Sequence, residues 1–249
     1  MRPACIVFDL DDTLYLERDY VRSGFRAVAA WAQSALGISD FFDRAWRQFE
    51  NGIRGATFRN VLAEYGRNPE PDLVDQMVEI YRSHSPQIEL LPDALHCLSS
   101  LKGRIALGMI TDGPATCQNL KCANLGLRNF FELIVCTGEW GLDFHKPHPR
   151  AFEFVQEQMG SGKGGFVYVA DNPFKDFHAP IALGWETVRV RRPGGLHSEK
   201  QASANFVPTI EIANLWDFPD LIENFFAVGD LSGQDRTGSR VSPCAGIKQ

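Results

Sequence analysis

Hydrophobic and polar positions follow two different periods along this chain of 249 residues. Several short apolar runs end abruptly in polar residues, which is typical of buried parallel strands. These runs are Cys5 to Phe8, Ile105 to Ile110, Leu133 to Cys136, Phe166 to Ala170, 186–190 and 205–207. Helical apolar spacing lies near 92–102, 115–125, 149–159 and 211–226. The alternation predicts an α/β protein with a doubly wound, mainly parallel Rossmann-like sheet.

The segment between the first two strands has a different pattern. From Glu17 to about Ser85 there is almost no strand signal, and apolar residues such as Val21, Phe25 and Val28 recur at helical spacing. Glycines and prolines divide it into four predicted helices. They lie near 17–36, 40–51, 57–65 and 71–84. We therefore predict a small α-helical domain over 16–88, inserted into a core formed by 1–15 and 89–228.

Composition narrows the range of partners. The chain has 25 basic and 31 acidic residues, a net charge of −6, which argues against nucleic acid or an anionic membrane as partner and favours a small molecule. Its six cysteines are scattered without a CxxC pair, as in reduced cytoplasmic proteins. No signal peptide or membrane-spanning run is apparent, so we expect a cytoplasmic monomer or homodimer. The polar, glycine- and serine-rich stretch 229–249 predicts a disordered tail.

Three carboxylates follow the first strand. Strand alternation places Asp9 and Asp11 on one side and leaves Asp12 to serve the turn. Two carboxylates a few ångströms apart repel each other unless a cation or a shared proton relieves them. Taken alone, the cluster is also compatible with an acidic turn after an edge strand. The carboxyl end of a parallel strand is nevertheless where open α/β sheets bind ligands.

Later strands end in further reactive side chains. Thr111, Asp112 and Gly113 form a strand-to-helix turn whose hydroxyl and backbone N–H groups suit an oxyanion, although a simple helix cap is also possible. Lys146 stands before Pro147, where little conformational freedom remains around a positive charge. A second acidic cluster, Asp171 to Asp176, follows the strand at 166–170.

In this order and spacing, the four segments resemble the motifs of the haloacid dehalogenase superfamily of hydrolases. The matching segments are Asp9-Leu10-Asp11-Asp12-Thr13, Thr111-Asp112-Gly113, Lys146-Pro147 and Asp171-Asn172-Pro173-Phe174-Lys175-Asp176. The likeness extends over roughly residues 4 to 207 and points to the phosphatase branch. It implies that the helical insert is a cap domain above the active site.

The resemblance also implies catalytic roles. Asp9 would be the nucleophile that forms an aspartyl-phosphate, and Asp11 would act as general acid and then general base. Thr111 and Lys146 would hold the phosphate oxygens, together with the backbone N–H groups at Asp112 and Gly113.

A metal site is implied as well. Asp9, Asp171 and the backbone carbonyl of Asp11 would ligate Mg²⁺, with Asp176 supporting them. Electrostatics also favour a bound cation, because the repulsion between two like charges about 4 Å apart costs roughly 4 kcal/mol even at an effective dielectric constant of 20.

Residues of the first motif and of the helical insert also distinguish between branches of this superfamily. Dehalogenases lack the second acid of the first motif, so Asp11 favours phosphoryl transfer, and the absence of lysine from 16–88 disfavours phosphonate cleavage. A phosphomutase or phosphotransferase would share all four motifs, and a non-catalytic phosphometabolite-binding protein could retain the fold.

The substrate itself is predicted only as a class. We expect a small phosphorylated metabolite, such as a sugar phosphate or a nucleoside monophosphate. Candidate contacts in the cap are Arg18, Arg22, Arg54, Arg59, Tyr20 and Phe25.

Overall fold

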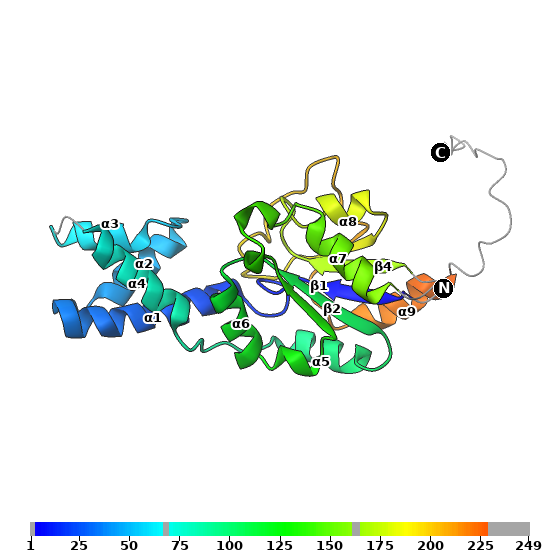
Figure 1. The fold of residues 1–249 in the computed structure, drawn as a ribbon, viewed down its shortest axis with the longest axis horizontal. Coiled ribbons are helices and arrows are strands. Elements are labelled where there is room, and N and C mark those ends of the chain that lie inside the picture. Colours follow the sequence, from blue (N-terminus) through cyan, green and yellow to red (C-terminus); the bar gives the residue numbers. More distant parts are fainter. Residues whose placement is uncertain (1–2, 67–69, 161–164, 229–249) are drawn as a thin grey trace, which may run out of the picture.

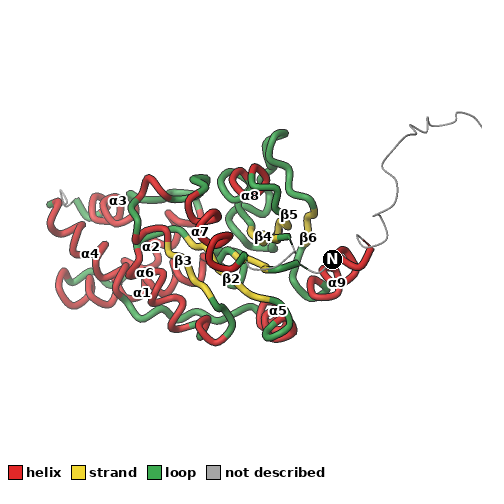
Figure 2. Tube along the Cα trace, turned by 45° about the vertical axis from the view of Figure 1, so that its right-hand side comes forward, coloured by secondary structure: helices red, strands yellow, loops and turns green. Residues whose placement is uncertain are grey.

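The computed structural model describes residues 3–66, 70–160 and 165–228, and the predicted tail over 229–249 lies outside these residues. Figure 1 shows a helical bundle at one end of the molecule and a sheet flanked by helices at the other. Figure 2 gives the same arrangement after a rotation, with the strands running through the middle of the second part.

The sheet has six strands in the order β3-β2-β1-β4-β5-β6, and every pairing is parallel. Their bounds are β1 Cys5–Phe8, β2 Ala106–Thr111, β3 Leu133–Cys136, β4 Phe166–Ala170, β5 Glu186–Val190 and β6 Ile210–Ile212. The chain moves outward from β1 to β3 and then returns to β4 on the other side of β1. The prediction of a doubly wound sheet is confirmed, and its topological switch point lies between β1 and β4.

Helices cover both faces of the sheet, which explains why the strands read as continuous apolar runs. In β1, Ile6 and Phe8 face one core cluster while Cys5 and Val7 face the other. The first face carries α5 (Pro92–Leu101), α6 (Ala115–Asn124) and α9 (Phe218–Val228). The second carries α7 (Arg150–Met159) and α8 (His178–Ala182) (Figure 1).

The C-terminal part of the sheet differs from the prediction. The expected strand over 205–207 and the helix start at 211 are wrong, because β6 occupies Ile210–Ile212 and α9 begins at Phe218. Ile210 and Ile212 pair in register with Val188 and Val190 of β5. Pairing with an existing strand outweighs the helical spacing of this short apolar stretch. The five-residue helix α8 was not predicted at all.

The helical insert forms α1 (Glu17–Leu36), α2 (Phe41–Glu50), α3 (Thr57–Glu64) and α4 (Pro71–Ser83), close to the predicted ranges. These helices share a core of their own, which includes Phe25, Phe41, Phe58, Val61 and Met77. Because α1 follows β1 almost directly, the bundle lies at the end of the sheet where β1 ends (Figure 1).

Two other expectations can be compared with the described residues. Five cysteines, namely Cys5, Cys97, Cys117, Cys122 and Cys136, are free and buried, as expected of reduced thiols. None of the helices in the described ranges is both long and apolar enough to cross a membrane.

A buried ion pair between Arg192 and Asp93 links the N-terminal and C-terminal segments of the sheet domain. Arg192 lies 2.7 Å from Asp93 at the start of α5, and its Nε donates to the carbonyl of Thr13. The Asp93 carboxylate also accepts the backbone N–H of Leu215 at 2.7 Å. The loop after β1, helix α5 and the segment before α9 are therefore held by one pair of charges.

We expect Asp93→Ala to lower the free energy of unfolding by about 3–5 kcal/mol, because Arg192 would be left as an uncompensated buried charge. Urea denaturation measures the change. Asp75→Ala, at an exposed position of α4, is the matched control and should change stability by less than about 0.5 kcal/mol. Equal losses for the two variants would contradict the importance of the buried pair.

Candidate active site

The turn after β1 carries the first acidic residues. Asp9 donates its backbone N–H to the carbonyl of Val169, so this residue stays in the middle of the sheet. Asp12 has φ of 54°, and its carboxylate accepts the backbone N–H groups of Glu17 at 2.9 Å and Leu196 at 2.7 Å. Asp12 therefore shapes the turn and the start of α1, as the sequence predicted.

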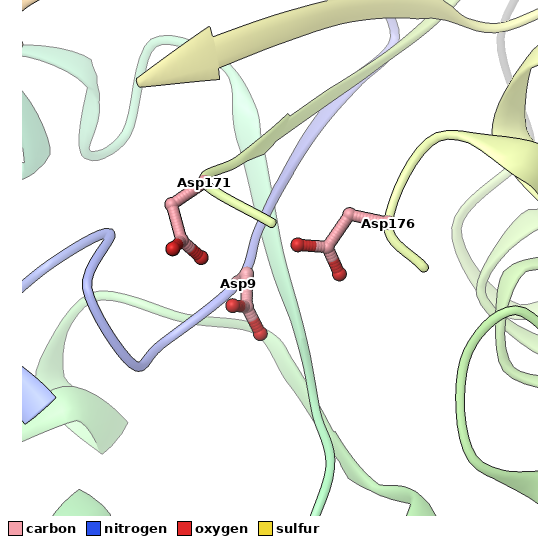
Figure 3. Close-up of side chains that lie close together, drawn as sticks. All are labelled: Asp9, Asp171 and Asp176. Carbon is pink, nitrogen blue, oxygen red and sulfur yellow. The ribbon is translucent and has the colours of Figure 1, made fainter. Parts of the chain in front are cut away.

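Three carboxylates converge at the carboxyl ends of β1 and β4. Asp9, Asp171 and Asp176 are buried and each offers an oxygen within 4.8 Å of the others. Figure 3 shows these side chains pointing toward one another. Asp176 is oriented by the turn after β4, where its Oδ2 accepts the backbone N–H of Asn172 at 2.9 Å. Two acidic stretches separated by most of the sequence thus form one cluster.

Lys146 inserts a positive charge into this cluster. Its Nζ lies 2.6 Å from Asp9 Oδ1 and 2.8 Å from Asp176 Oδ1, and it donates to the Tyr168 hydroxyl at 3.0 Å. The Lys146 side chain has no exposed surface. Burial opposes the charge, but Asp176 and Asp9 raise the pKa of Lys146 well above its ordinary value. The ammonium form therefore persists at neutral pH.

One lysine does not neutralise the cluster. Burial raises the pKa of Asp9 to about 7 even though Lys146 acts in the opposite direction. Burial also raises the pKa of Asp171 well above its ordinary value, and Asp176 and Asp9 add to the shift. The buried Oδ2 of Asp171 has no hydrogen-bond partner among the described residues. Carboxylate oxygens so arranged fit a hard divalent cation such as Mg²⁺.

The Asp11 side chain lies outside the three-carboxylate cluster. Its Oδ1 accepts from the Tyr15 hydroxyl and lies 2.7 Å from Lys121 Nζ, while its Oδ2 accepts from Gln118 Nε2 at 3.0 Å. Burial alone would raise the pKa of Asp11, but Lys121 and these hydrogen bonds hold it below its ordinary value. The Asp11 side chain is therefore not available as a metal ligand. Its backbone carbonyl is the group for which the sequence predicts metal binding.

Thr111 ends β2 with its side chain fully buried. Its Oγ1 accepts from Gln118 Nε2 at 2.6 Å, so one glutamine contacts both Thr111 and Asp11. The first and second motifs are thereby joined through α6.

Asp112 connects the loops rather than presenting its carboxylate to a ligand. The carboxylate accepts from Thr137 Oγ1 at 2.8 Å, from the backbone N–H of Lys146 at 3.1 Å and from Lys175 Nζ at 2.7 Å. If Asp112 binds phosphate, it therefore does so through its backbone N–H, as Gly113 would.

Two glycines are required where the loops after β2 and β3 meet, and the first of them is Gly113. Its φ of 124° lies in the left-handed region. The loop after β3 also approaches closely, because a Cβ on Gly138 would lie 2.0 Å from the Gly113 carbonyl oxygen. Two adjacent loops therefore meet at the backbone, beside the turn that the sequence analysis assigned to phosphate.

Sequence reasoning missed Gln118, Lys121, Lys175 and Tyr168. A signal existed for two of them. In α6, Cys117, Gln118, Lys121 and Cys122 fall on one buried face, so the helical period places an amide and an ammonium group where apolar residues are expected.

A cavity of about 330 Å³ lies within the helical insert. Its wall includes the aromatic residues Phe25, Phe49, Phe58 and Tyr81. Charged side chains also line it, namely Glu17, Arg54, Arg59 and Arg82. Two of the predicted cap arginines and Phe25 thus reach this cavity.

The remaining cap candidates have other neighbours. The guanidinium groups of Arg18 and Arg22 lie over the Trp46 ring, at 5.6 and 4.7 Å from its centroid. Tyr20 is buried with Lys121 Nζ 4.2 Å from its ring centroid. The cap candidates that face the cavity are therefore Arg54, Arg59 and Phe25.

The sheet order and the buried charges at its switch point indicate an α/β enzyme. The chain belongs to the haloacid dehalogenase-like hydrolases, since the profile of that family matches residues 6–190. The predictions of the family and of a hydrolase are thereby confirmed.

Known relatives extend over most of the chain. It is 29% identical over 228 residues to a glyceraldehyde 3-phosphate phosphatase of Methanopyrus kandleri, covering 87% of this chain and 96% of that protein. It is 28% identical over 197 residues to a phosphoserine phosphatase of Thermus thermophilus, covering 79% and 68%. The fold matches that of YfnB from Bacillus subtilis, solved bound to magnesium, with a TM-score of 0.67, 21% identity and coverage of 89% and 99%.

We expect Lys146→Met to lower the free energy of unfolding by about 3–5 kcal/mol in the presence of chelator, because the acidic cluster loses its buried counter-charge. Thermal or urea unfolding provides the measurement. Lys102→Met is the matched control: this exposed lysine lies 5.7 Å from the Phe130 ring, and its loss should cost less than about 1 kcal/mol. A Lys146 variant as stable as the control would refute the electrostatic account of the cluster.

Proposed function

We propose that the protein is a Mg²⁺-dependent phosphatase that hydrolyses a small phosphate monoester through an aspartyl-phosphate on Asp9. The observation that supports this proposal most strongly is the buried convergence of Asp9, Asp171 and Asp176, together with the ion pairs of Asp9 and Asp176 with Lys146 Nζ. This arrangement supports a role for Asp9 as nucleophile beside a fixed positive charge, with the carboxylate oxygens as donors for a divalent cation.

The reaction would proceed in two displacements. In the first, an Asp9 oxygen bonds to phosphorus while the bond from phosphorus to the substrate alcohol breaks, and Asp11, in its protonated carboxylic acid form, gives a proton to the departing alkoxide. In the second, Asp11 takes a proton from water, the water oxygen bonds to phosphorus, and the bond to Asp9 breaks. Inorganic phosphate and the free alcohol are the products.

The other residues would stabilise the transferring group. Lys146 and the Thr111 hydroxyl hold the non-bridging oxygens, together with backbone N–H groups at Asp112 and Gly113. Asp9, Asp171 and the Asp11 carbonyl would hold Mg²⁺, supported by Asp176. When bound, this ion neutralises charge on the phosphate and aligns it for in-line attack.

The comparisons support the phosphatase assignment. Relatives that align along most of the chain are named as phosphatases of glyceraldehyde 3-phosphate and phosphoserine, and YfnB, which shares the fold, was solved with magnesium. Asp11 supports it from the residues, because a phosphate ester with a poor leaving group needs a proton donor and a halide does not.

The substrate class follows from the cavity in the helical insert, which we propose as the cap domain. Its arginines favour an alcohol moiety with a further carboxylate, phosphate or hydroxyl group, and about 330 Å³ suits a small metabolite. A sugar phosphate or a phosphorylated hydroxy acid meets both requirements, and the aromatic wall also accommodates a nucleoside monophosphate.

Asp9→Asn should abolish release of phosphate from 4-nitrophenyl phosphate and from a panel of sugar phosphates and nucleotides. Wild-type turnover should require Mg²⁺ and be lost in chelator. Asp43→Asn, an exposed acid of α2, is the matched control and should keep full activity. Absence of Mg²⁺-dependent phosphate release by the folded wild type from every ester would defeat the proposal, while transfer of phosphate to a second alcohol would indicate a phosphotransferase.

Arg59→Gln should raise KM about ten- to a hundredfold for a phosphate ester with a second anionic group, because one charge-assisted hydrogen bond is worth about 1.5–3 kcal/mol. Activity on 4-nitrophenyl phosphate, which lacks that group, should change little. Arg22→Gln is the matched control, since Arg22 contacts Trp46 instead of the cavity. The same KM change for both esters would argue against recognition of the second anion by Arg59.

A further inference from the structure

Two polar groups in the wall of the cavity within the helical insert have no partner of their own. The Glu17 carboxylate, at the start of α1, makes no ion pair or side-chain hydrogen bond within the described residues 3–66, 70–160 and 165–228. The Tyr81 hydroxyl, near the end of α4, has no hydrogen-bond partner in these parts of the chain either. Unpaired polar groups that line a cavity are available to a ligand.

Glu17 joins the cavity to the catalytic end of the sheet. Its backbone N–H donates to Asp12 Oδ1 at 2.9 Å, which ties the start of α1 to the turn after β1. Burial raises the pKa of Glu17 to about 7, and the charged groups with the largest further effects are Asp11 and Lys121. Such effects fall off with distance, so Glu17 lies close to both. A substrate whose phosphate lies at Asp9 therefore extends past Glu17 into the cavity.

Close packing fixes the ring of Tyr81. Gly24 of α1 has no side chain, and a Cβ at that position would lie 2.4 Å from Tyr81 Cδ2. Edge contacts with the rings of Tyr20 and Phe58 follow, at centroid distances of 5.5 and 5.9 Å. Burial raises the pKa of Tyr81, and Glu17 is the charged group that adds most to this rise. The acceptor oxygens of Glu17 and the donor hydroxyl of Tyr81 thus form one polar subsite.

A hydroxyl group suits this subsite better than an ammonium group does. A hydroxyl donates to a Glu17 oxygen and accepts from the Tyr81 hydroxyl at the same time, whereas an ammonium group has no acceptor to offer. Charge favours the same choice, because the described residues that line the cavity include three arginines and one carboxylate. A cationic substituent would be repelled by these arginines.

We propose that Glu17 and Tyr81 determine specificity by binding a hydroxyl group of the substrate, on the carbon next to the one that carries the phosphate ester. The proposal rests on the proposed phosphatase function. It narrows the substrate class to phosphate esters of polyols, sugars and hydroxy acids that have such a neighbouring hydroxyl. Arg59, in the same wall, remains the contact for a more distant anionic group.

The test uses three phosphate esters that differ at one carbon. At this carbon 3-phosphoglycerate carries a hydroxyl group, O-phosphoserine an ammonium group and 3-phosphonooxypropanoate only hydrogen, and all three share the same carboxylate. With Mg²⁺, the wild type should have a kcat/KM for 3-phosphoglycerate about ten- to a hundredfold above that for 3-phosphonooxypropanoate, as one charge-assisted hydrogen bond provides. Its kcat/KM for 3-phosphoglycerate should also exceed that for O-phosphoserine.

Variants of the two residues assign this preference to their side chains. In Glu17→Met the ratio of kcat/KM between 3-phosphoglycerate and 3-phosphonooxypropanoate should fall to about one, whereas Glu17→Gln keeps an acceptor oxygen and should retain part of it. Tyr81→Phe, which removes one oxygen atom, should lower the ratio about three- to tenfold, as loss of a neutral hydrogen bond does.

The measured ratio also separates specificity from folding. It compares two esters on the same enzyme, so a smaller folded fraction in a variant does not change it. If Glu17→Met does not fold at all, Tyr81→Phe still gives the result. Glu79→Met, at an exposed position of α4, is the matched control and should keep the wild-type ratio.

A wild type that does not favour 3-phosphoglycerate over 3-phosphonooxypropanoate, or that favours O-phosphoserine over both, would overturn the proposal. An unchanged ratio in Tyr81→Phe and in any folded Glu17→Met would overturn it as well. In each case Mg²⁺-dependent hydrolysis of 4-nitrophenyl phosphate by the wild type leaves the phosphatase function intact. By contrast, a wild type that releases phosphate from none of these esters defeats the phosphatase proposal itself, so the two failures are distinguishable.

Discussion

The ion pairs between the buried Lys146 ammonium group and the carboxylates of Asp9 and Asp176 are the interaction on which the site depends. Three acids cannot be brought together in a buried place without a counter-charge, because their mutual repulsion and desolvation act against folding. The parallel sheet brings the acids to one edge, and the loop after β3 brings the lysine. The raised pKa values of Asp9 and Asp171 show that one ammonium group compensates only part of this charge.

The turn after β1 divides its acids among three environments. Asp9 joins the carboxylate cluster, where burial raises its pKa to about 7, whereas Asp11 contacts Lys121 and Gln118 and has a lowered pKa. Asp12 is used for backbone hydrogen bonds. Two carboxylates of the same type and only two positions apart thus acquire opposite shifts from their surroundings, which is how one motif can supply distinct chemical roles.

Asp112 and Gln118 hold the loops after the strands together through hydrogen bonds and ion pairs. Asp112 contacts the loops after β3 and β4 through Thr137, Lys146 and Lys175, and Gln118 joins Thr111 to Asp11. Such contacts hold side chains from separate strands at fixed distances, which is the requirement for electrostatic stabilisation of a transition state. They lie in loops whose backbones are themselves held by the sheet.

The sequence by itself determined the strands β1 to β5, most of the helices and the edge of the sheet at which the motif residues gather, because apolar runs with polar ends encode a buried parallel sheet locally. It did not determine β6, since Ile210 and Ile212 become a strand only through pairing with β5. Nor did it separate Asp11 from the carboxylate cluster or assign partners to Lys121. Those depend on contacts between residues distant in the chain, and only the tertiary structure, which sets distances and burial, decided which acid meets which base.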